Sequence, residues 1–275
     1  MTATAAAASK ERNSKLLSLF TLGAMPSKAM RGGLQLASLL LPLLLWTAIA
    51  SLGLVDEKFL PSPQAVFRSL AAMAESGILF QDIVASTGRV FGGFLLATLL
   101  AVPIGICMGV YPAICALCEP LIAMLRYMPA AAFIPLLIIY LGIGEEPKIA
   151  LIFIGTVYFN ILMVMDAVKF VPKELIETTL TLGGKSRQVL VQVVARYSLP
   201  SIIDTLRINI ATSWNLVVVA ELVAAEVGLG KRIQLAQRFF RTDQIFAELI
   251  VLGLIGFAID MGFRLLLRLS CKWAI

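Results

Sequence analysis

The protein has 275 residues, of which 59% are apolar and only 15% are charged, and its mean hydropathy is +0.91. Because soluble domains are about 45–50% apolar, this composition excludes a water-soluble fold and predicts an all-α polytopic membrane protein. The net charge of +6 is accounted for by the orientation of the chain in the membrane and requires no nucleic-acid partner.

Residues 1–32 are predicted to form a cytosolic tail. Five apolar residues beside basic ones indicate a short helix on the inner membrane surface: Leu16, Leu17, Leu19, Phe20 and Leu22. A disordered alanine-rich tail is the alternative for residues 1–13. The next apolar run contains Ala48-Ile49-Ala50, which resembles a signal-peptide cleavage site, but it continues to Val55 and is therefore expected to be an uncleaved span.

Residues 33–275 are predicted to form one domain of about six transmembrane helices. Each apolar stretch is close to the length of a spanning helix, about 18–20 residues. The predicted spans are Leu34–Val55, Val90–Val110, Leu121–Gly142, Ile149–Val168, Ile202–Val223 and Ile245–Leu267.

Lys and Arg residues predict the orientation of these spans. With both termini in the cytosol, the cytosolic segments hold 13 of these residues and the outer segments hold eight. An excess of positive charge on the cytosolic side is the usual arrangement in membrane proteins.

Two features interrupt the pattern of simple spans. Between the first two spans, Val66, Leu70 and Met73 have helical spacing and predict an amphipathic helix at the outer interface, beginning after Pro61 and Pro63.

The third span contains Pro129 and Pro135 and ends in glycines. A broken span is tolerated beside a water-lined path, so this span is a candidate for the solute path, with a simple packing kink as the alternative.

The longest predicted cytosolic segment covers residues 169–199. A helical run from Lys173 to Leu182 stops at Gly183-Gly184, and a second amphipathic run from Arg187 to Tyr197 leads to Pro200. This hairpin is expected to expose Leu175, Ile176, Leu180 and Leu182. Exposed apolar residues on a surface hairpin indicate a partner groove that covers them.

In this hairpin the sequence resembles the membrane subunits of bacterial binding-protein-dependent ABC importers. Their cytosolic signature is Glu-Ala-Ala, then three residues, then Gly, and it corresponds in this sequence to Glu177-Thr178-Thr179, Leu180-Thr181-Leu182 and Gly183. Two threonines replace the alanines, and the usual first Leu-Pro falls on Ala195-Arg196, whereas the repeated one is present as Leu199-Pro200. These differences affect the details of the docking contacts.

Other stretches resemble the nitrate/sulfonate/taurine/bicarbonate permease family, and the resemblance extends over about residues 58–268. The matching pieces are Phe59-Leu60-Pro61-Ser62-Pro63, Arg89-Val90-Phe91-Gly92-Gly93-Phe94, Glu119-Pro120-Leu121-Ile122, Tyr140-Leu141-Gly142-Ile143-Gly144 and Ala220-Glu221 with Gly228-Leu229-Gly230. Many relatives read Arg-Pro-x-Pro-Pro where this chain has Arg126-Tyr127-Met128-Pro129-Ala130. The solute therefore does not follow from the resemblance.

The resemblance implies a type I ABC importer permease fold and a transport subunit that is not itself an enzyme. It implies a second copy of the permease as a homodimer, two cytosolic ATPase subunits that hold ATP and Mg, and an extracytoplasmic solute-binding protein. It also implies location in the bacterial inner membrane. The residues that it assigns to ATPase coupling are Glu177, Thr178, Thr179, Gly183 and Gly184.

Polar residues in the middle spans are candidates to line the solute path, namely Asn160, Asn209, Ser213 and Asn215. Hydrogen bonding between helices is the competing explanation. For Arg126 and Arg207, near Asp166 and Asp204, structural ion pairing is favoured over anion binding. Asp260 and Arg264 are four residues apart and are expected to form a pair on one helix.

The outer loop before the last span is unusually basic for its predicted side. Its Lys231, Arg232, Arg238 and Arg241 would attract an anionic solute or dock an acidic binding protein, with lipid headgroup contact as the alternative.

The solute expected from the family is a small oxyanion such as nitrate, bicarbonate, a sulfonate or taurine; a neutral vitamin precursor is the first alternative and an ion-coupled carrier is the second. The chain has no histidine, and its four cysteines are expected to be packing residues, so neither a metal site nor a catalytic group is predicted. It also lacks a phosphate-binding loop, so this chain is expected to bind no cofactor.

Overall fold

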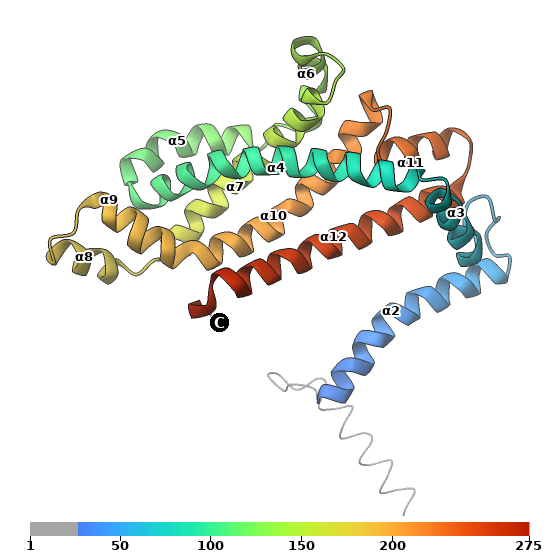
Figure 1. Cartoon of the computed structure of the whole chain (residues 1–275), viewed down its shortest axis with the longest axis horizontal. Helices are drawn as coiled ribbons and strands as arrows, with labels where there is room; N and C mark the ends of the chain where they lie inside the picture. Colours follow the sequence, from blue (N-terminus) through green and yellow to red (C-terminus); the bar gives the residue numbers. More distant parts are fainter. Residues whose placement is uncertain (1–26, 275) are drawn as a thin grey trace, which may run out of the picture. The chain divides into compact units, whose positions relative to one another are not determined.

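The computed structural model describes residues 27–274, which are almost entirely helical (Figure 1). The chain divides into two compact units, one ending at Gln64 and one beginning at Ala65. The surface helix predicted around Leu16–Leu22 lies outside the described residues. The predicted start of the membrane domain at residue 33 falls inside the first described helix, whose N-terminus is capped by the Ser27 hydroxyl.

In chain order, the elements are α2 (Lys28–Ser51), α3 (Pro63–Glu75), α4 (Ile78–Val110), α5 (Pro112–Leu125), η2 (Ala130–Phe133), α6 (Ile134–Leu141), α7 (Glu146–Lys169), α8 (Lys173–Thr181), α9 (Ser186–Gln188), the π-helical η3 (Val189–Val194), α10 (Ala195–Ala224), α11 (Leu229–Arg238), α12 (Thr242–Ser270) and η4 (Lys272–Ala274).

The prediction of about six spans is confirmed. Among the described residues, five helical segments are long and apolar enough to cross a membrane, and a sixth crossing results if the bent pair formed by 112–125 and 130–141 is one span. The predicted amphipathic helix after Pro63 is also confirmed as α3, in which Val66 and Met73 are buried. The expected all-α class therefore holds over the part of the chain that the structure describes.

The second span begins much earlier than predicted. Its helix, α4, starts at Ile78 and not near Val90, so the segment assigned to an outer loop contributes three more turns of helix. Asp82, Ser86 and Arg89 lie in these turns and are buried. These charged residues do not end the helix, because Asp82 and Arg89 each form an ion pair with a residue of another element.

The third span is broken as its prolines predicted, but it starts at Pro112 rather than Leu121. Helix α5 ends at Leu125, and the chain resumes at Ala130 at an angle of 81°. Pro129 has extended backbone angles, which a helix cannot accommodate.

The fifth span is longer than predicted because its helix does not stop at Pro200. Helix α10 begins at Ala195 and contains Pro200. The wider π-helical turn of η3 immediately precedes it, and the Ser198 hydroxyl donates a hydrogen bond of 2.7 Å to the Val194 carbonyl. Membrane helices tolerate proline when such local adjustments satisfy the backbone.

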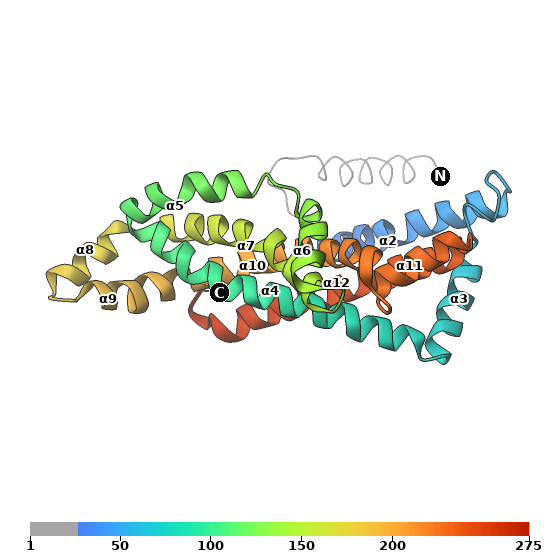
Figure 2. The ribbon, with the colours of Figure 1, turned by 90° about the horizontal axis from the view of Figure 1, so that it is seen from above.

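Helices α4, α7 and α10 pack against one another and form the centre of the unit that begins at Ala65 (Figures 1 and 2). Small residues recur every fourth position on the α4 face that meets α7: Gly93, Ala97, Ala101, Gly105 and Gly109. A Cβ atom at Gly105 would lie 2.8 Å from both the Ile161 carbonyl oxygen and the Val164 side chain. Close backbone approach through small residues is a common way to pack helices in membranes.

We predict that Gly105→Leu weakens the packing of α4 on α7. Overpacking usually costs ~1–3 kcal/mol, so the thermal unfolding temperature of the purified protein should fall. Gly88→Leu is the matched control, because it lies on the same helix and its added Cβ would meet nothing within 4 Å. Equal losses in the two variants would contradict the assignment of Gly105 to a tight helix contact.

Candidate functional site

A buried arginine ties several helices together at the end of the bundle that carries α11. Arg89 of α4 is only 3% exposed. Its Nε and Nη2 atoms donate to the Glu145 carboxylate at 2.5 and 2.8 Å, and its Nη1 atom donates to Glu221 Oε1 and to the Val227 carbonyl, both at 2.7 Å. One guanidinium therefore connects α4 to the start of α7, to α10 and to the loop after α10.

Glu221 of α10 is fully buried, and donors surround its carboxylate. In addition to Arg89, the Ser86 hydroxyl donates to Oε1 at 2.7 Å and the Gly230 amide donates to Oε2 at 2.8 Å. Gly228 has a φ of +134°, and a Cβ atom there would lie 2.5 Å from this carboxylate. The chain can therefore fold closely over Glu221 only with glycine at position 228.

Asp82 of α4 joins the same arrangement from its other side. Its Oδ1 atom accepts a hydrogen bond from the Gly228 amide at 2.7 Å, and its Oδ2 atom accepts one from Arg232 Nε at 2.8 Å. The side chain of Asp82 is fully buried, whereas that of Arg232 is 23% exposed. This pair holds the first turn of α11 against α4.

Glu145 completes the contacts at the start of α7. Lys148 Nζ donates to it at 2.9 Å. The hydrogen bonds from Arg89 are the largest influence on this carboxyl group and, with Lys148, lower the pKa of Glu145 to about 2. Since this pKa lies below the ordinary value of 4.5, the stabilisation from the pair is complete above pH 4.5 and is lost as the pH falls through about 2.

We call this set of contacting residues the end network. Its members are Asp82, Ser86, Arg89, Glu145, Lys148, Glu221 and Arg232.

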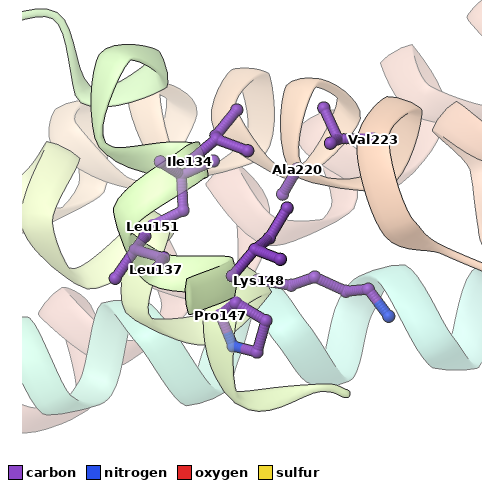
Figure 3. Close-up of a pocket in the computed structure, with 8 residues that line it drawn as sticks. Ile134, Leu137, Pro147, Lys148, Leu151, Ala220 and Val223 are labelled. Carbon is purple, nitrogen blue, oxygen red and sulfur yellow. The ribbon is translucent and has the colours of Figure 1, made fainter. Parts of the chain in front are cut away.

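The second half of the broken span packs beside the end network. Figure 3 shows Ile134 and Leu137 of α6 facing Leu151 of α7 and Ala220 of α10 across a small apolar pocket. The amine of Lys148 extends away from these apolar groups. The break at Pro129 therefore places α6 against α7, beside a pocket that Ala220 and Val223 of α10 also line.

The candidate path residues are brought together only in part. Asn209 Nδ2 donates to Asn160 Oδ1 at 2.8 Å, and Asn160 Nδ2 reaches Thr98 Oγ1 at 3.5 Å. Both asparagines are buried, so the competing explanation, a hydrogen bond between helices, does apply to this pair on α7 and α10. Ser213 is also buried, and its hydroxyl has no hydrogen-bond partner among the described residues.

Asn215, the fourth candidate, lies elsewhere and is exposed. It lines a pocket of about 380 Å³ between α10 and α12, together with Trp214, Arg207 and Asp260. Arg207 pairs with Asp260 at 2.6 Å and with Asp204 at 2.9 Å, and Arg264 donates to Asp260 at 2.7 Å. These contacts confirm the predicted ion pairing of Arg207 and the predicted pair of Asp260 and Arg264.

Arg126 does not follow the same prediction. It lies in the break of the third span, where its guanidinium is 4.9 Å from the centre of the Tyr127 ring. Its expected neighbour Asp166 instead contacts Lys169 at 3.5 Å. The bend after Leu125 gives Arg126 a cation–π contact.

The four basic residues predicted to face an anion or a binding protein have different surroundings. Arg232 belongs to the end network, and Arg241 pairs with Asp243 at 3.3 Å. Lys231 approaches Gln234 at 3.3 Å, and Arg238 is exposed at the last turn of α11. Arg232 is thus a structural residue, whereas Lys231 is half-buried and Arg238 and Arg241 are exposed.

The predicted coupling residues lie on a hairpin at the other end of α10. Glu177 and Thr178 are exposed on α8. The predicted turn is confirmed, since Gly183 has a φ of +83° and the Gly184 amide donates to the Thr179 carbonyl at 2.9 Å. A Cβ at Gly184 would lie 2.7 Å from that carbonyl oxygen, so the turn has no room for a side chain there.

The apolar surface of this hairpin is smaller than predicted. Leu175, Leu180 and Leu182 are exposed as expected. Ile176 instead packs on a buried cluster formed by Val168, Val171, Val189 and Val194. This cluster fixes α8 against η3 and leaves three leucines available to a partner.

Sequence reasoning did not identify the end network as a unit. The predicted span Val90–Val110 leaves out Asp82, Ser86 and Arg89, although their spacing of four and three places them on one face of a helix. Glu221 and Gly228 were noted only as pieces of a family pattern. A helix with buried polar residues on one face is the signal that points to this site.

Comparisons with known proteins agree with this architecture. The family described as "Binding-protein-dependent transport system inner membrane component" matches residues 93–270. The taurine transport system permease protein of Escherichia coli (strain K12) is 34% identical over 245 residues, covering 87% of this chain and 89% of the relative. The riboflavin transport system permease protein of Chloroflexus aurantiacus is 31% identical and covers 86% of this chain and 88% of the relative.

A solved structure has the same fold. A chain of the MetNI methionine ABC transporter, crystallised in an inward-facing conformation, superimposes with a TM-score of 0.62 at 18% identity. The match covers 70% of this chain and 95% of that chain. The predicted type I ABC importer permease fold is thereby confirmed.

We predict that Arg89→Gln strongly destabilises the protein. Removing one partner of a buried pair typically costs ~3–5 kcal/mol, because the other charge stays buried without a counter-charge. Adding Glu221→Gln should recover much of this loss, as measured by thermal unfolding of single and double variants. Arg241→Gln is the control; its exposed pair should contribute no more than about 1 kcal/mol. Additive losses in the double variant would contradict a direct coupling of Arg89 and Glu221.

Proposed function

Since the chain belongs to the family of binding-protein-dependent transport system inner membrane components, it is the permease subunit of an ABC importer, and we propose that its solute is a small oxyanion of the sulfonate type. The observation that carries the choice of solute is the 34% identity to the taurine permease, which extends over most of both chains. A neutral vitamin is the second candidate, because the riboflavin permease is 31% identical over a similar length. The family membership excludes the ion-coupled carrier.

The proposed partners follow from the family. They are a second copy of this chain, two ATPase subunits and an extracytoplasmic solute-binding protein. ATP and Mg are assigned to the ATPase subunits, because a phosphate-binding loop needs Gly-x-x-x-x-Gly-Lys-Ser/Thr. The closest segment of this chain ends in Gly184-Lys185-Ser186 but has Thr179 at the position of the first glycine.

The proposed location is the bacterial inner membrane, with both termini in the cytosol. In this orientation α8 and α9 lie on the cytosolic side and the end network lies at the outer side. The distribution of Lys and Arg residues supports this choice, because the cytosolic segments then hold 13 of these residues and the outer segments hold eight.

We place the energy coupling on the α8 hairpin. The exposed Leu175, Leu180 and Leu182 supply an apolar surface that an ATPase groove would cover. Glu177 and Thr178 lie beside them on α8. Movement of this surface would pass through the buried valine cluster to η3 and then to α10, whose 30 residues extend for about 45 Å at 1.5 Å per residue.

The proposed path is closed inside this subunit in the present conformation. Asn160 and Asn209 are hydrogen-bonded to each other and are buried. The end network holds α4, α7, α10 and α11 together at the outer side. We propose that ATP-driven movement of α10 separates these helix ends when the importer opens to the outside.

We predict that substitutions at Gly183 change the coupling of ATP hydrolysis to transport according to whether the new residue tolerates a positive φ. Gly183→Val should reduce the solute imported per ATP hydrolysed, because a β-branched residue opposes the φ of +83°. Gly183→Asn is the matched control and should retain most coupling, because asparagine tolerates this region. Proteoliposomes that contain the whole complex allow both rates to be measured. Equal coupling in the two variants would contradict a need for this turn.

Charge reversal by Glu177→Arg should also lower the uptake rate while the protein remains inserted in the membrane. Residue 177 is exposed, so the change should leave the unfolding temperature unaltered. Undiminished import would remove Glu177 from the coupling surface.

The solute assignment predicts saturable uptake of labelled taurine by the complex reconstituted with its own ATPase and binding protein. Alkanesulfonates should compete, and nitrate, bicarbonate and riboflavin serve as comparison compounds. Uptake of riboflavin without uptake of any sulfonate would overturn the proposed solute and leave the transport class intact.

A further inference from the structure

One buried carboxylate lies against the end network without belonging to it. Glu248 is in α12, in the second turn after the helix start at Thr242, and its side chain is fully buried within this single chain. Neither of its carboxylate oxygens has a hydrogen-bond donor among the described residues. Because the side chain has no exposed surface, neither lipid nor a second subunit can reach it in this conformation.

The charges around Glu248 come from three other helices. Asp82 of α4, Glu221 of α10 and Arg232 of α11 are the ionisable groups that act on it. Each already has partners: Asp82 and Arg232 pair with each other, and Glu221 accepts from Arg89, Ser86 and Gly230. No donor of these groups lies within hydrogen-bond distance of the Glu248 carboxylate.

A count of charges also indicates that Glu248 has no counter-charge. The end network and Glu248 together contain four carboxyl groups (Asp82, Glu145, Glu221, Glu248) and three cations (Arg89, Lys148, Arg232). Every cation is within 2.9 Å of one of the first three carboxylates. If all four were ionised, one negative charge would be buried without compensation, at high cost.

From this geometry we propose that Glu248 is a proton-binding site, occupied when the outer end of the permease is closed. One proton added to the carboxylate gives a neutral carboxylic acid, and the network becomes electrically balanced. A metal ion is a poorer ligand for this site, because the described residues contain no group of three or more acidic or cysteine side chains that could hold one. A single buried carboxylate that receives no hydrogen bond from the described residues accommodates a proton.

The consequence for transport rests on the proposed function. Separation of the helix ends would admit water to Glu248, which then loses its proton to that water. The resulting carboxylate would repel Asp82 and Glu221 and would oppose reclosure until a proton returned. Proton binding and closure at the outer end are linked in this way, and the proton adds nothing to the ATP that drives transport.

The first test is infrared spectroscopy of the purified protein in lipid nanodiscs. At pH 7 the wild type should show the C=O stretching band of a protonated carboxylic acid, and Glu248→Gln should lack it. Glu226→Gln is the control, because Glu226 is exposed in the loop at the same end of the bundle. A wild-type spectrum without such a band at pH 7, or a band that persists in Glu248→Gln, would overturn the proposal.

The second test is the pH dependence of thermal unfolding. Glutamate titrates at about pH 4.3 in an unfolded chain. If Glu248 keeps its proton to a higher pH in the folded protein, the free energy of unfolding falls as the pH rises. Glu248→Gln should therefore unfold at a higher temperature than the wild type at pH 8, and the difference should shrink towards pH 5. Glu248→Leu provides a second variant of similar size with no titrating group.

Two other outcomes of these unfolding measurements would contradict the proposal. Destabilisation by both substitutions at every pH would show an ionised Glu248 with a counter-charge. A wild-type unfolding temperature that depends on Na⁺ or K⁺, with no such dependence in Glu248→Gln, would show a bound cation. Either result would overturn the proton site.

The link to transport has its own measurement. In the whole complex trapped with ATP and vanadate, the carboxylic-acid band should disappear if the outer end opens. Persistence of the band during normal import would disprove proton release and leave the importer assignment standing. Absence of any ATP-driven import would refute the proposed coupling and leave the spectroscopic result unaffected.

Discussion

The arrangement of the helix ends depends on the burial of Arg89. A guanidinium cannot lose its charge, so inside a membrane protein it must be surrounded by acceptors. Four hydrogen bonds from this one group reach Glu145, Glu221 and the Val227 carbonyl. These acceptors belong to α10, to the residue before α7 and to the loop before α11. The need to surround the Arg89 guanidinium with acceptors therefore fixes the positions of these three segments relative to one another. The glycine at position 228 is a consequence, because the loop must pass within contact distance of Glu221.

The two ends of the bundle are held by different kinds of interaction, and this difference is consistent with the proposed movement of the α8 hairpin and α10. At the α8 end the contacts are apolar and non-directional, made by Val168, Val189 and their neighbours. At the α11 end they are short and charge-assisted, so they favour one discrete arrangement. Between them the small residues of α4 keep α7 close along its length. Movement at the hairpin is therefore carried by rigid helices to a contact that is either made or broken.

The features that depend on neighbouring residues in the sequence could be predicted, whereas those that depend on contacts between distant residues could not. The number of spans and the turn at Gly183 follow from local signals, hydropathy and a glycine pair, and both were predicted correctly. The start of α4 was not, because Asp82 and Arg89 look like loop residues until they are paired with Arg232 and Glu221, more than 130 positions away in the sequence. The prolines predicted the break in the third span, but its angle depends on packing against α7.

The same network bears on how an importer of this kind recognises its solute. Arg232, a cation at the proposed outer end, is already neutralised by Asp82. The polar pair in the middle of the bundle, Asn160 and Asn209, carries no charge. Neither feature distinguishes a sulfonate from a neutral compound. We propose that the binding protein contributes to this selection, since the permeases for taurine and for riboflavin are each about one third identical to this chain.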